Sequence, residues 1–218
     1  MIKIHGVPLS PFVRKTLFTL EYKELEYENN PVFPGAEDDE FRAISPLGKI
    51  PILEHDGFTT PDSSVICRYL ENVFPENSIY PEDPRDDAKA TWIEEFADTK
   101  LVEALAGLFT QRFLNPKFLG EPTDEQAVTN ILENLVPPVL DYLETITPEE
   151  GLLVGSSVTI ADIAVVTCFI QAQYADFEPD ADKYPRIKRY LDYTLNSDLV
   201  KNRLKSEQEA LAQMGFSA

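Results

Sequence analysis

The chain has 218 residues, 43% of them hydrophobic and 26% charged, which is enough to form the cores of two small domains. Its formal net charge of -19 argues against nucleic acid as a partner, because phosphate binding needs clustered Lys and Arg, and against an anionic membrane surface. No apolar run approaches the roughly 20 residues that cross a bilayer, and we recognise no signal peptide. Because the only two cysteines, Cys67 and Cys168, are far apart, we expect a cytoplasmic protein without a disulfide framework.

The N-terminal segment predicts a strand, a helix and a second strand. Residues 2–6 (IKIHG) form a short strand pattern. Ser10 then stands at an N-cap position before Pro11. Proline is tolerated at the first helical position, because the N–H that it lacks would have no intrahelical partner there. Apolar residues at helical spacing continue to Leu20, and residues 25–30 (LEYENN) predict the next strand.

The following segment predicts a β-hairpin. Residues 37–48 are polar and predict an irregular stretch with one or two helical turns. Asp56-Gly57 separates the apolar segments 50–55 (IPILEH) and 58–60 (FTT), and Asp-Gly is a strong signal for a two-residue hairpin turn.

The rest of the chain predicts helices. A helix with one apolar face begins near Asp62 or Ser63, which completes a β-α-β-α-β-β-α domain over residues 1–79. A linker rich in proline and charge occupies residues 80–87, and an all-α domain occupies residues 88–218. Its predicted helices run from near 84–86 to about 113, from about 123 to 143 with a bend or break at Pro137-Pro138, over 159–173, after Pro185 and after Ser197.

Four short motifs occur in order along the chain: SPFVRKT at 10–16, SPLGKIPIL at 45–53, PDSSVICRYL at 61–70 and TIAD at 159–162. Together they resemble the cytosolic glutathione transferases, a detoxification family, in its bacterial form with a serine-type active site. The resemblance implies a thioredoxin-like N-terminal domain that binds glutathione as co-substrate and an all-α C-terminal domain. It also implies a homodimer, a small hydrophobic electrophile as second substrate, and no metal.

Ser10 has two interpretations. The LSPF pattern by itself favours a serine that only caps a helix. The resemblance implies that Ser10 donates a hydrogen bond to the glutathione sulfur. A bond to a charged group is worth about 1.5–3 kcal/mol, which lowers a thiol pKa by about one to two units from roughly 8.5. A nucleophilic serine is not indicated, because neither His5 nor His55 belongs to a Ser-His-Asp pattern.

The resemblance also assigns glutathione contacts to three further places. Ile50-Pro51 is expected to be a cis peptide that offers the Ile50 backbone to the cysteinyl part of glutathione, like a short added strand. Lys49 is expected beside the glycyl carboxylate, and its alternative is a solvated surface charge. Ser63 and its helix N-terminus are expected to receive the γ-glutamyl carboxylate. The remaining expected glutathione contacts are Asp62, at the γ-glutamyl amino group and one methylene shorter than the Glu of many relatives, and Phe12.

TIAD has a structural interpretation, because Thr159 and Asp162 have the spacing of a capping box. The electrophile pocket is expected between the two domains. Arg112 is a candidate for binding an anionic substituent, and ordinary core packing is an equally good explanation for the aromatic residues. The expected pocket residues are Val7, Pro8 and Phe12 from the first domain and Phe109, Arg112, Phe113 and Tyr174 from the second.

Other functions stay open at this stage. Thiol-disulfide reduction or peroxidase activity ranks lower, because branches with that chemistry usually place Cys where this chain has Ser10. Glutathione-dependent isomerisation ranks lower because the serine- and cysteine-rich motif of that branch is absent. A non-catalytic binding protein has no need for the set Ser10, Lys49, Ile50-Pro51 and Ser63.

Overall fold

The computed structural model describes residues 1–33 and 39–213, and it divides into two compact units. The first unit comprises Met1–Ile79 together with Ser197–Ala218, and the second comprises Tyr80–Asn196. The sequence-based division assigned everything from residue 88 onward to the helical domain. The structure instead groups the last helix, α10 (Asp198–Gln213), with the first unit.

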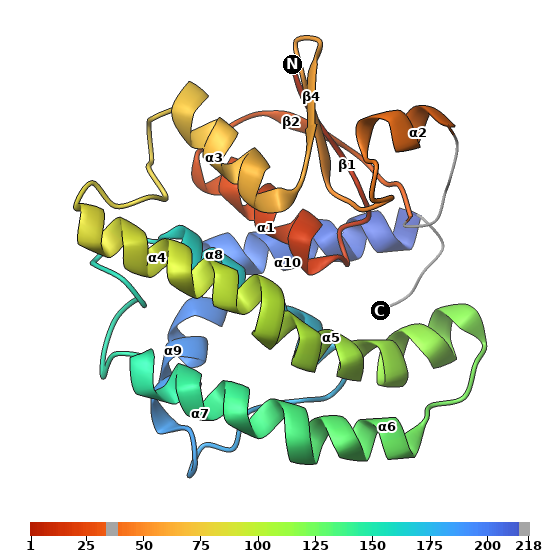
Figure 1. The fold of residues 1–218 in the computed structure, drawn as a ribbon, viewed down its shortest axis with the longest axis vertical. Coiled ribbons are helices and arrows are strands. Elements are labelled where there is room, and N and C mark those ends of the chain that lie inside the picture. Colours follow the sequence, from red (N-terminus) through yellow and green to blue (C-terminus); the bar gives the residue numbers. More distant parts are fainter. Residues whose placement is uncertain (34–38, 214–218) are drawn as a thin grey trace. The chain divides into compact units, whose positions relative to one another are not determined.

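The first unit has the predicted order β-α-β-α-β-β-α (Figure 1). Its sheet has the strand order β2-β1-β3-β4, in which β1 and β2 are parallel and the other pairs are antiparallel. This is the thioredoxin-like arrangement. The elements are β1 (Ile2–His5), α1 (Pro11–Tyr22), β2 (Tyr27–Asn30), α2 (Asp39–Ile44), β3 (Ile52–His55), β4 (Phe58–Pro61) and α3 (Ser63–Val73).

The sequence explains two features of this unit, which are the turn between β3 and β4 and the hydrophobic core. Asp56 and Gly57 connect β3 to β4 with φ values of 49° and 83°, which confirms the predicted two-residue turn. The apolar faces of α1 and α3 pack with the sheet into one core that includes Ile4, Leu17 and Leu53. Burial of such side chains, at about 25 cal/mol per Å², is the main stabilising contribution to this unit.

The second unit is entirely helical within its regular elements, as predicted. Two long helical runs contain π-helical segments, two in the first run and one in the second. The segment in the second run ends at Leu135, just before Val136 and Pro137-Pro138, where the sequence predicted a bend or a break. The first run begins at Pro84, inside the predicted linker, because Asp83 caps it by accepting from the backbone N–H groups of Arg85 and Asp86. The elements are α4 (Pro84–Phe96), η1 (Ala97–Leu101), α5 (Val102–Phe109), η2 (Thr110–Leu119), α6 (Glu125–Asn130), η3 (Ile131–Leu135), α7 (Val136–Ile146), α8 (Ile160–Gln173) and α9 (Pro185–Leu195).

Helix α8 is buried from Ile160 to Ala172, as its continuous apolar sequence predicted. The capping box is confirmed, since Asp162 Oδ2 accepts from both the backbone N–H and the hydroxyl of Thr159. Asp162 Oδ1 accepts from the Leu153 N–H at 2.9 Å and from the Tyr190 hydroxyl at 3.1 Å. Burial raises the pKa of Asp162, and these four hydrogen bonds act in the opposite direction. The role of TIAD is therefore structural.

Within the described residues, no helix combines the length and the apolar composition that spanning a bilayer requires.

Candidate active site

Ser10 lies in the loop between β1 and α1 and is half-buried. Its hydroxyl oxygen accepts from the Val13 backbone N–H at 3.5 Å, which is long for a capping bond. The Ser10 N–H donates to the Val7 carbonyl at 3.1 Å, so the backbone of the loop is tied more firmly than the side chain. No acceptor for the Ser10 hydroxyl proton occurs among the described residues, which leaves that proton available to a ligand.

The predicted cis peptide at Ile50-Pro51 is present, and both residues are buried. The ladder between β1 and β3 begins only at Ile52, and no described residue forms a hydrogen bond with the Ile50 N–H or C=O. Buried backbone groups are normally paired, so the N–H and C=O of Ile50 are candidates for hydrogen bonds with a bound molecule.

Lys49 is exposed, but its backbone is held firmly. The hydroxyl of the buried Ser45 accepts from the Lys49 N–H at 3.0 Å and donates to the Lys49 carbonyl at 2.7 Å. The Lys49 ammonium has no hydrogen bond or ion pair with any residue in the described ranges. A fixed backbone with an unengaged ammonium suits capture of a ligand carboxylate.

The N-terminus of α3 provides the third group of donors. Asp62 is its N-cap, with Oδ1 accepting from the N–H groups of Ser64 at 3.0 Å and Val65 at 3.1 Å. Its φ of 77° is unusual for a residue other than glycine. Ser63 is buried, and neither its N–H nor its hydroxyl has a partner in the described part of the chain. These two donors, beside a helix N-terminus, favour an anion.

Strand register brings these three places together. His5 at the end of β1 pairs with Ile52 at the start of β3, and Ile52 pairs with Pro61 at the end of β4. The loop that follows β1, the peptide that precedes β3 and the residues that follow β4 therefore lie at the same end of the sheet, and these segments carry Ser10, Ile50 and Ser63.

At Gly6 the backbone packs closely against the side chains of Val13 and Ile50. A Cβ at Gly6 would lie 2.5 Å from Val13 Cγ2 and 3.2 Å from Ile50 Cβ, and its φ is 150°. Only glycine fits here, between Val13 of α1 and Ile50, in this backbone conformation.

Phe12 is half-buried on α1 in the first unit, and Val7 and Pro8 are buried there. The second-unit residues predicted for the electrophile pocket form an aromatic cluster. Ring centroids lie 5.1 Å apart for Phe109 and Phe113 and 4.9 Å apart for Phe113 and Tyr174. Both phenylalanines are buried, which favours the core-packing interpretation for them.

Arg112 lies in the same part of the second unit as that aromatic cluster. Its Nη1 donates to the Ala175 carbonyl, beyond the end of α8, at 3.2 Å, so at least part of the guanidinium has a structural contact.

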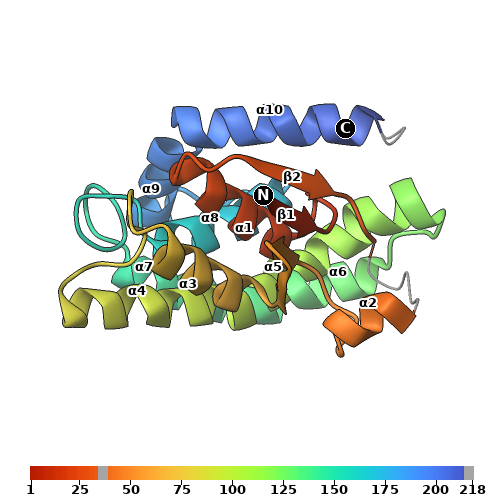
Figure 2. The same ribbon diagram turned by 90° about the horizontal axis from the view of Figure 1, so that it is seen from above.

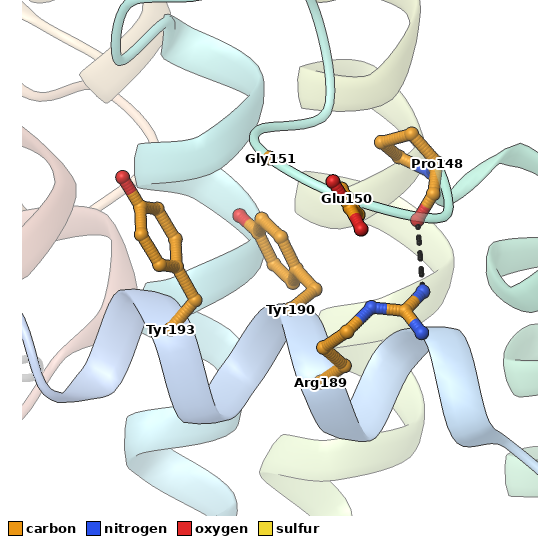
Figure 3. A pocket seen from close by; sticks show the side chains of 6 residues that line it. All are labelled: Pro148, Glu150, Gly151, Arg189, Tyr190 and Tyr193. Carbon is orange, nitrogen blue, oxygen red and sulfur yellow. Dashed lines mark hydrogen bonds between the residues drawn. The ribbon is translucent and has the colours of Figure 1, made fainter.

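A pocket of about 260 Å³ lies elsewhere in the second unit, as Figure 3 shows. Arg189 projects along one side and donates to the Pro148 carbonyl at 3.4 Å. None of the predicted site residues lines this pocket, and its lining consists of Pro148, Glu150, Gly151, Arg189, Tyr190 and Tyr193.

The two histidines are engaged away from Ser10. His5 Nδ1 lies 3.1 Å from Asn30 Nδ2, and His55 Nδ1 lies 2.9 Å from the Tyr69 hydroxyl. This agrees with the view that Ser10 is not a nucleophile activated by a histidine base.

Two buried cations on α1 were missed at the sequence level. Arg14 and Lys15 follow Ser10 closely and have no exposed surface. Lys15 Nζ donates to the Ser64 hydroxyl at 2.9 Å, next to Ser63. The available signal was two adjacent charges inside an apolar helical pattern, where burial requires partners.

Comparison with known proteins places this chain in one protein family. The N-terminal domain of glutathione S-transferases matches residues 4–78, and the C-terminal domain of the same family matches residues 109–207. A hematopoietic prostaglandin D synthase from Gallus gallus is 30% identical over 171 residues, which are 78% of this chain and 78% of that protein. A glutathione S-transferase structure from Rhodospirillum rubrum has a TM-score of 0.80 at 25% identity, covering 94% of this chain and 92% of that chain.

Protein LigF from Sphingobium is 43% identical over 91 residues, which are 38% of this chain and 35% of LigF. A structure of LigF, described as a beta-etherase, has a TM-score of 0.73 at 25% identity and covers 94% of this chain and 99% of LigF. The fold, the site and these similarities define one class of protein. The chain belongs to the glutathione S-transferase family and is a glutathione transferase.

Proposed function

We propose that this enzyme conjugates the glutathione thiolate to hydrophobic electrophiles and that Ser10 stabilises the thiolate. The observation that carries the proposal is the unused hydrogen-bonding groups of Ser10, Ile50 and Ser63 at one end of the sheet. A protein that used this fold only as a scaffold would have no reason to leave buried polar groups unpaired.

Each part of glutathione has a counterpart in this site. The γ-glutamyl carboxylate binds the Ser63 N–H and hydroxyl at the start of α3. The γ-glutamyl amino group binds the carboxylate of Asp62, which also caps the helix. The cysteinyl backbone pairs with Ile50 beside Pro51, and the glycyl carboxylate meets Lys49. Phe12 completes the set as a van der Waals contact near the sulfur.

The chemistry is a nucleophilic substitution or addition. The bound thiol loses its proton to solvent, and the Ser10 hydroxyl donates a hydrogen bond to the resulting thiolate. The sulfur lone pair forms a C–S bond with the electrophilic carbon. In a substitution the leaving group departs with the electron pair of the broken bond; in an addition the π bond breaks and the resulting carbanion takes up a proton from solvent. One bond to the anion, at about 1.5–3 kcal/mol, keeps much of the thiol ionised near neutral pH.

Replacement of Ser10 tests this role directly. Ser10→Ala should raise the pKa of enzyme-bound glutathione by about one to two units, to roughly 8.5, and lower turnover at neutral pH by about 8- to 25-fold. Ultraviolet absorbance of the thiolate, titrated against pH, measures the first effect. Ser10→Thr is the matched control, since it keeps the hydroxyl. If the pH titration of bound glutathione were the same in Ser10→Ala as in the wild type, Ser10 would act only as a helix cap.

A second candidate is cleavage of an ether by the same thiolate. The observation that favours it is the 43% identity with LigF over 91 residues. In this reaction the sulfur attacks a carbon that bears an ether oxygen, the C–O bond breaks, and the alkoxide or phenoxide leaves and takes up a proton. Parallel assays with aryl halides, peroxides, isomerisation substrates and aryl ethers rank the candidates. Activity confined to ethers would displace general conjugation.

We further propose that two copies of this chain form a homodimer through α3. Val65 and Val73 lie two helical turns apart on one side of α3 and are 51% and 43% exposed. Phe58 is 48% exposed and stacks on Tyr69 of the same helix, which extends this apolar surface. Sedimentation equilibrium should give a dimer for the wild type and a monomer for Val65→Glu.

We also propose a reducing, cytoplasmic location. Cys67 and Cys168 are buried thiols in different units, and no disulfide involves either residue in the described chain. Fractionation of the native source tests this location.

A further inference from the structure

Two cation–carboxylate pairs, one fully buried and one partly buried, connect α10 to the remainder of the first unit, where it lies beside α1 (Figure 2). Arg14 donates from Nε and Nη2 to the two carboxylate oxygens of Glu207, both at 2.8 Å, and neither side chain has exposed surface. Arg203 Nη1 donates to Glu21 Oε1 at 2.6 Å and to the Tyr27 hydroxyl at 2.9 Å.

The first of these pairs also reaches the loop that carries Ser10. Arg14 Nη2 donates to the Leu9 carbonyl at 3.4 Å, and Leu9 directly precedes Ser10. The backbone N–H of Arg14 donates to the Ser10 carbonyl at 2.8 Å. Arg14 therefore contacts the backbone on both sides of Ser10, and Glu207 orients the Arg14 guanidinium from a position 193 residues away in sequence.

We propose that Arg14 and Glu207 are positioning residues for Ser10. The Glu207 carboxylate fixes the plane of the guanidinium, the guanidinium holds the Leu9 carbonyl, and the backbone at Leu9–Ser10 sets the direction of the Ser10 hydroxyl. This inference rests on the proposed role of Ser10 as the donor to the glutathione thiolate. Helix α10 then has a direct influence on the ionisation of that thiol.

The geometry of the site makes such support necessary. The strength of a hydrogen bond falls steeply as its angle and distance depart from the optimum. The side chain of Ser10 has only a 3.5 Å capping bond, so its position depends on the backbone that carries it. Arg14 suits this task because a guanidinium stays charged in a protein and forms a bidentate, planar contact with a carboxylate.

A pair of double variants separates positioning from stability. Arg14→Met with Glu207→Leu removes the pair without changing net charge, and apolar replacement of both partners of a buried ion pair is often neutral for stability. Glu21→Leu with Arg203→Met is the matched control. It removes the other connection to α10, and Glu21 lies about 16 Å from Ser10 along the helix axis.

Two measurements decide the question. In the Arg14/Glu207 double variant, the pKa of bound glutathione should rise by about one unit, which lowers turnover at neutral pH by up to about tenfold. The Michaelis constant for glutathione should change little. Hydrogen exchange at the Ser10 amide, which needs no ligand, should become faster. The Glu21/Arg203 control should leave the pH profile and the Ser10 amide exchange unchanged.

The outcomes distinguish the two proposals. A folded Arg14/Glu207 double variant with wild-type pH profile and amide exchange would overturn the positioning role, as would an equal shift in the control. Failure of the wild type to form bound thiolate would overturn the proposed function. Amide exchange would then still test whether Arg14 and Glu207 hold the backbone at Ser10. If the double variant does not fold, Glu207→Gln replaces it, with a smaller shift expected in the same direction because Gln keeps one acceptor oxygen.

Discussion

Replacement of Lys49 offers a sharp test of the glutathione site. Lys49 is exposed, so its interaction with the glycyl carboxylate is screened by water, and such pairs contribute about 1 kcal/mol or less. Lys49→Ala should therefore weaken glutathione binding by about fivefold at physiological salt. The chain already has a formal net charge of -19, and the ligand is anionic. The loss should grow at low salt, where the screening length rises from about 8 Å to about 30 Å.

Isothermal titration at low and high salt measures both effects. Lys201→Ala is the matched control, because Lys201 is an exposed residue on α10 whose removal changes net charge equally. Equal losses for the two variants would show that only overall charge matters. If Lys49→Ala bound glutathione with unchanged affinity, Lys49 would not be a glutathione contact.

Three further predictions concern stability. Asp162→Ala should lower the free energy of unfolding by about 3 kcal/mol in urea titrations, because buried donors lose their acceptor, and Asp162→Asn should lose less. Burial, with Glu21 also contributing, raises the pKa of Tyr27 to about 12, so its stabilising contribution is complete below pH 10 and is lost as the pH rises through 12. Tyrosinate absorbance of wild type minus Tyr27→Phe should show that late titration. Gly6→Ala should cost about 3 kcal/mol, measured by thermal unfolding, because its Cβ would meet Val13 at a strained φ.

Local patterns predicted most elements of the fold. The Asp56-Gly57 turn, the Asp62 helix start, the fully buried α8 and the TIAD capping box are each set by residues within a few positions of one another, and all four are present. The start of α4 at Pro84 also agrees with the predicted start near residues 84–86, although the predicted linker overlaps it. The prolines and charges of residues 80–87 resemble a linker, although Asp83 and Pro84 also form a good helix start.

The candidate site was accessible from the sequence only through resemblance. Spacing alone does not show that Ile50 has unpaired backbone groups or that Ser10 has a weak capping bond. The first fact depends on where the ladder between β1 and β3 begins, and the second depends on the geometry of the loop that leads into α1. For the electrophile pocket, the sequence pattern was ambiguous. Aromatic residues at helical spacing fit the wall of a binding pocket and a packed core cluster equally well, and the structure has a packed cluster around Phe113.

The amino-acid sequence by itself determined the order of helices and strands and the turn and cap residues, because these depend on short-range geometry and on hydrophobic periodicity, which are encoded locally. Its motifs point to glutathione through their resemblance to a family. Only the tertiary structure decided that α10 belongs with the first unit and that Glu207 binds Arg14 beside Ser10. A buried charge can be recognised from sequence as needing a partner, but the partner is selected by the packing of two helices that lie far apart along the chain.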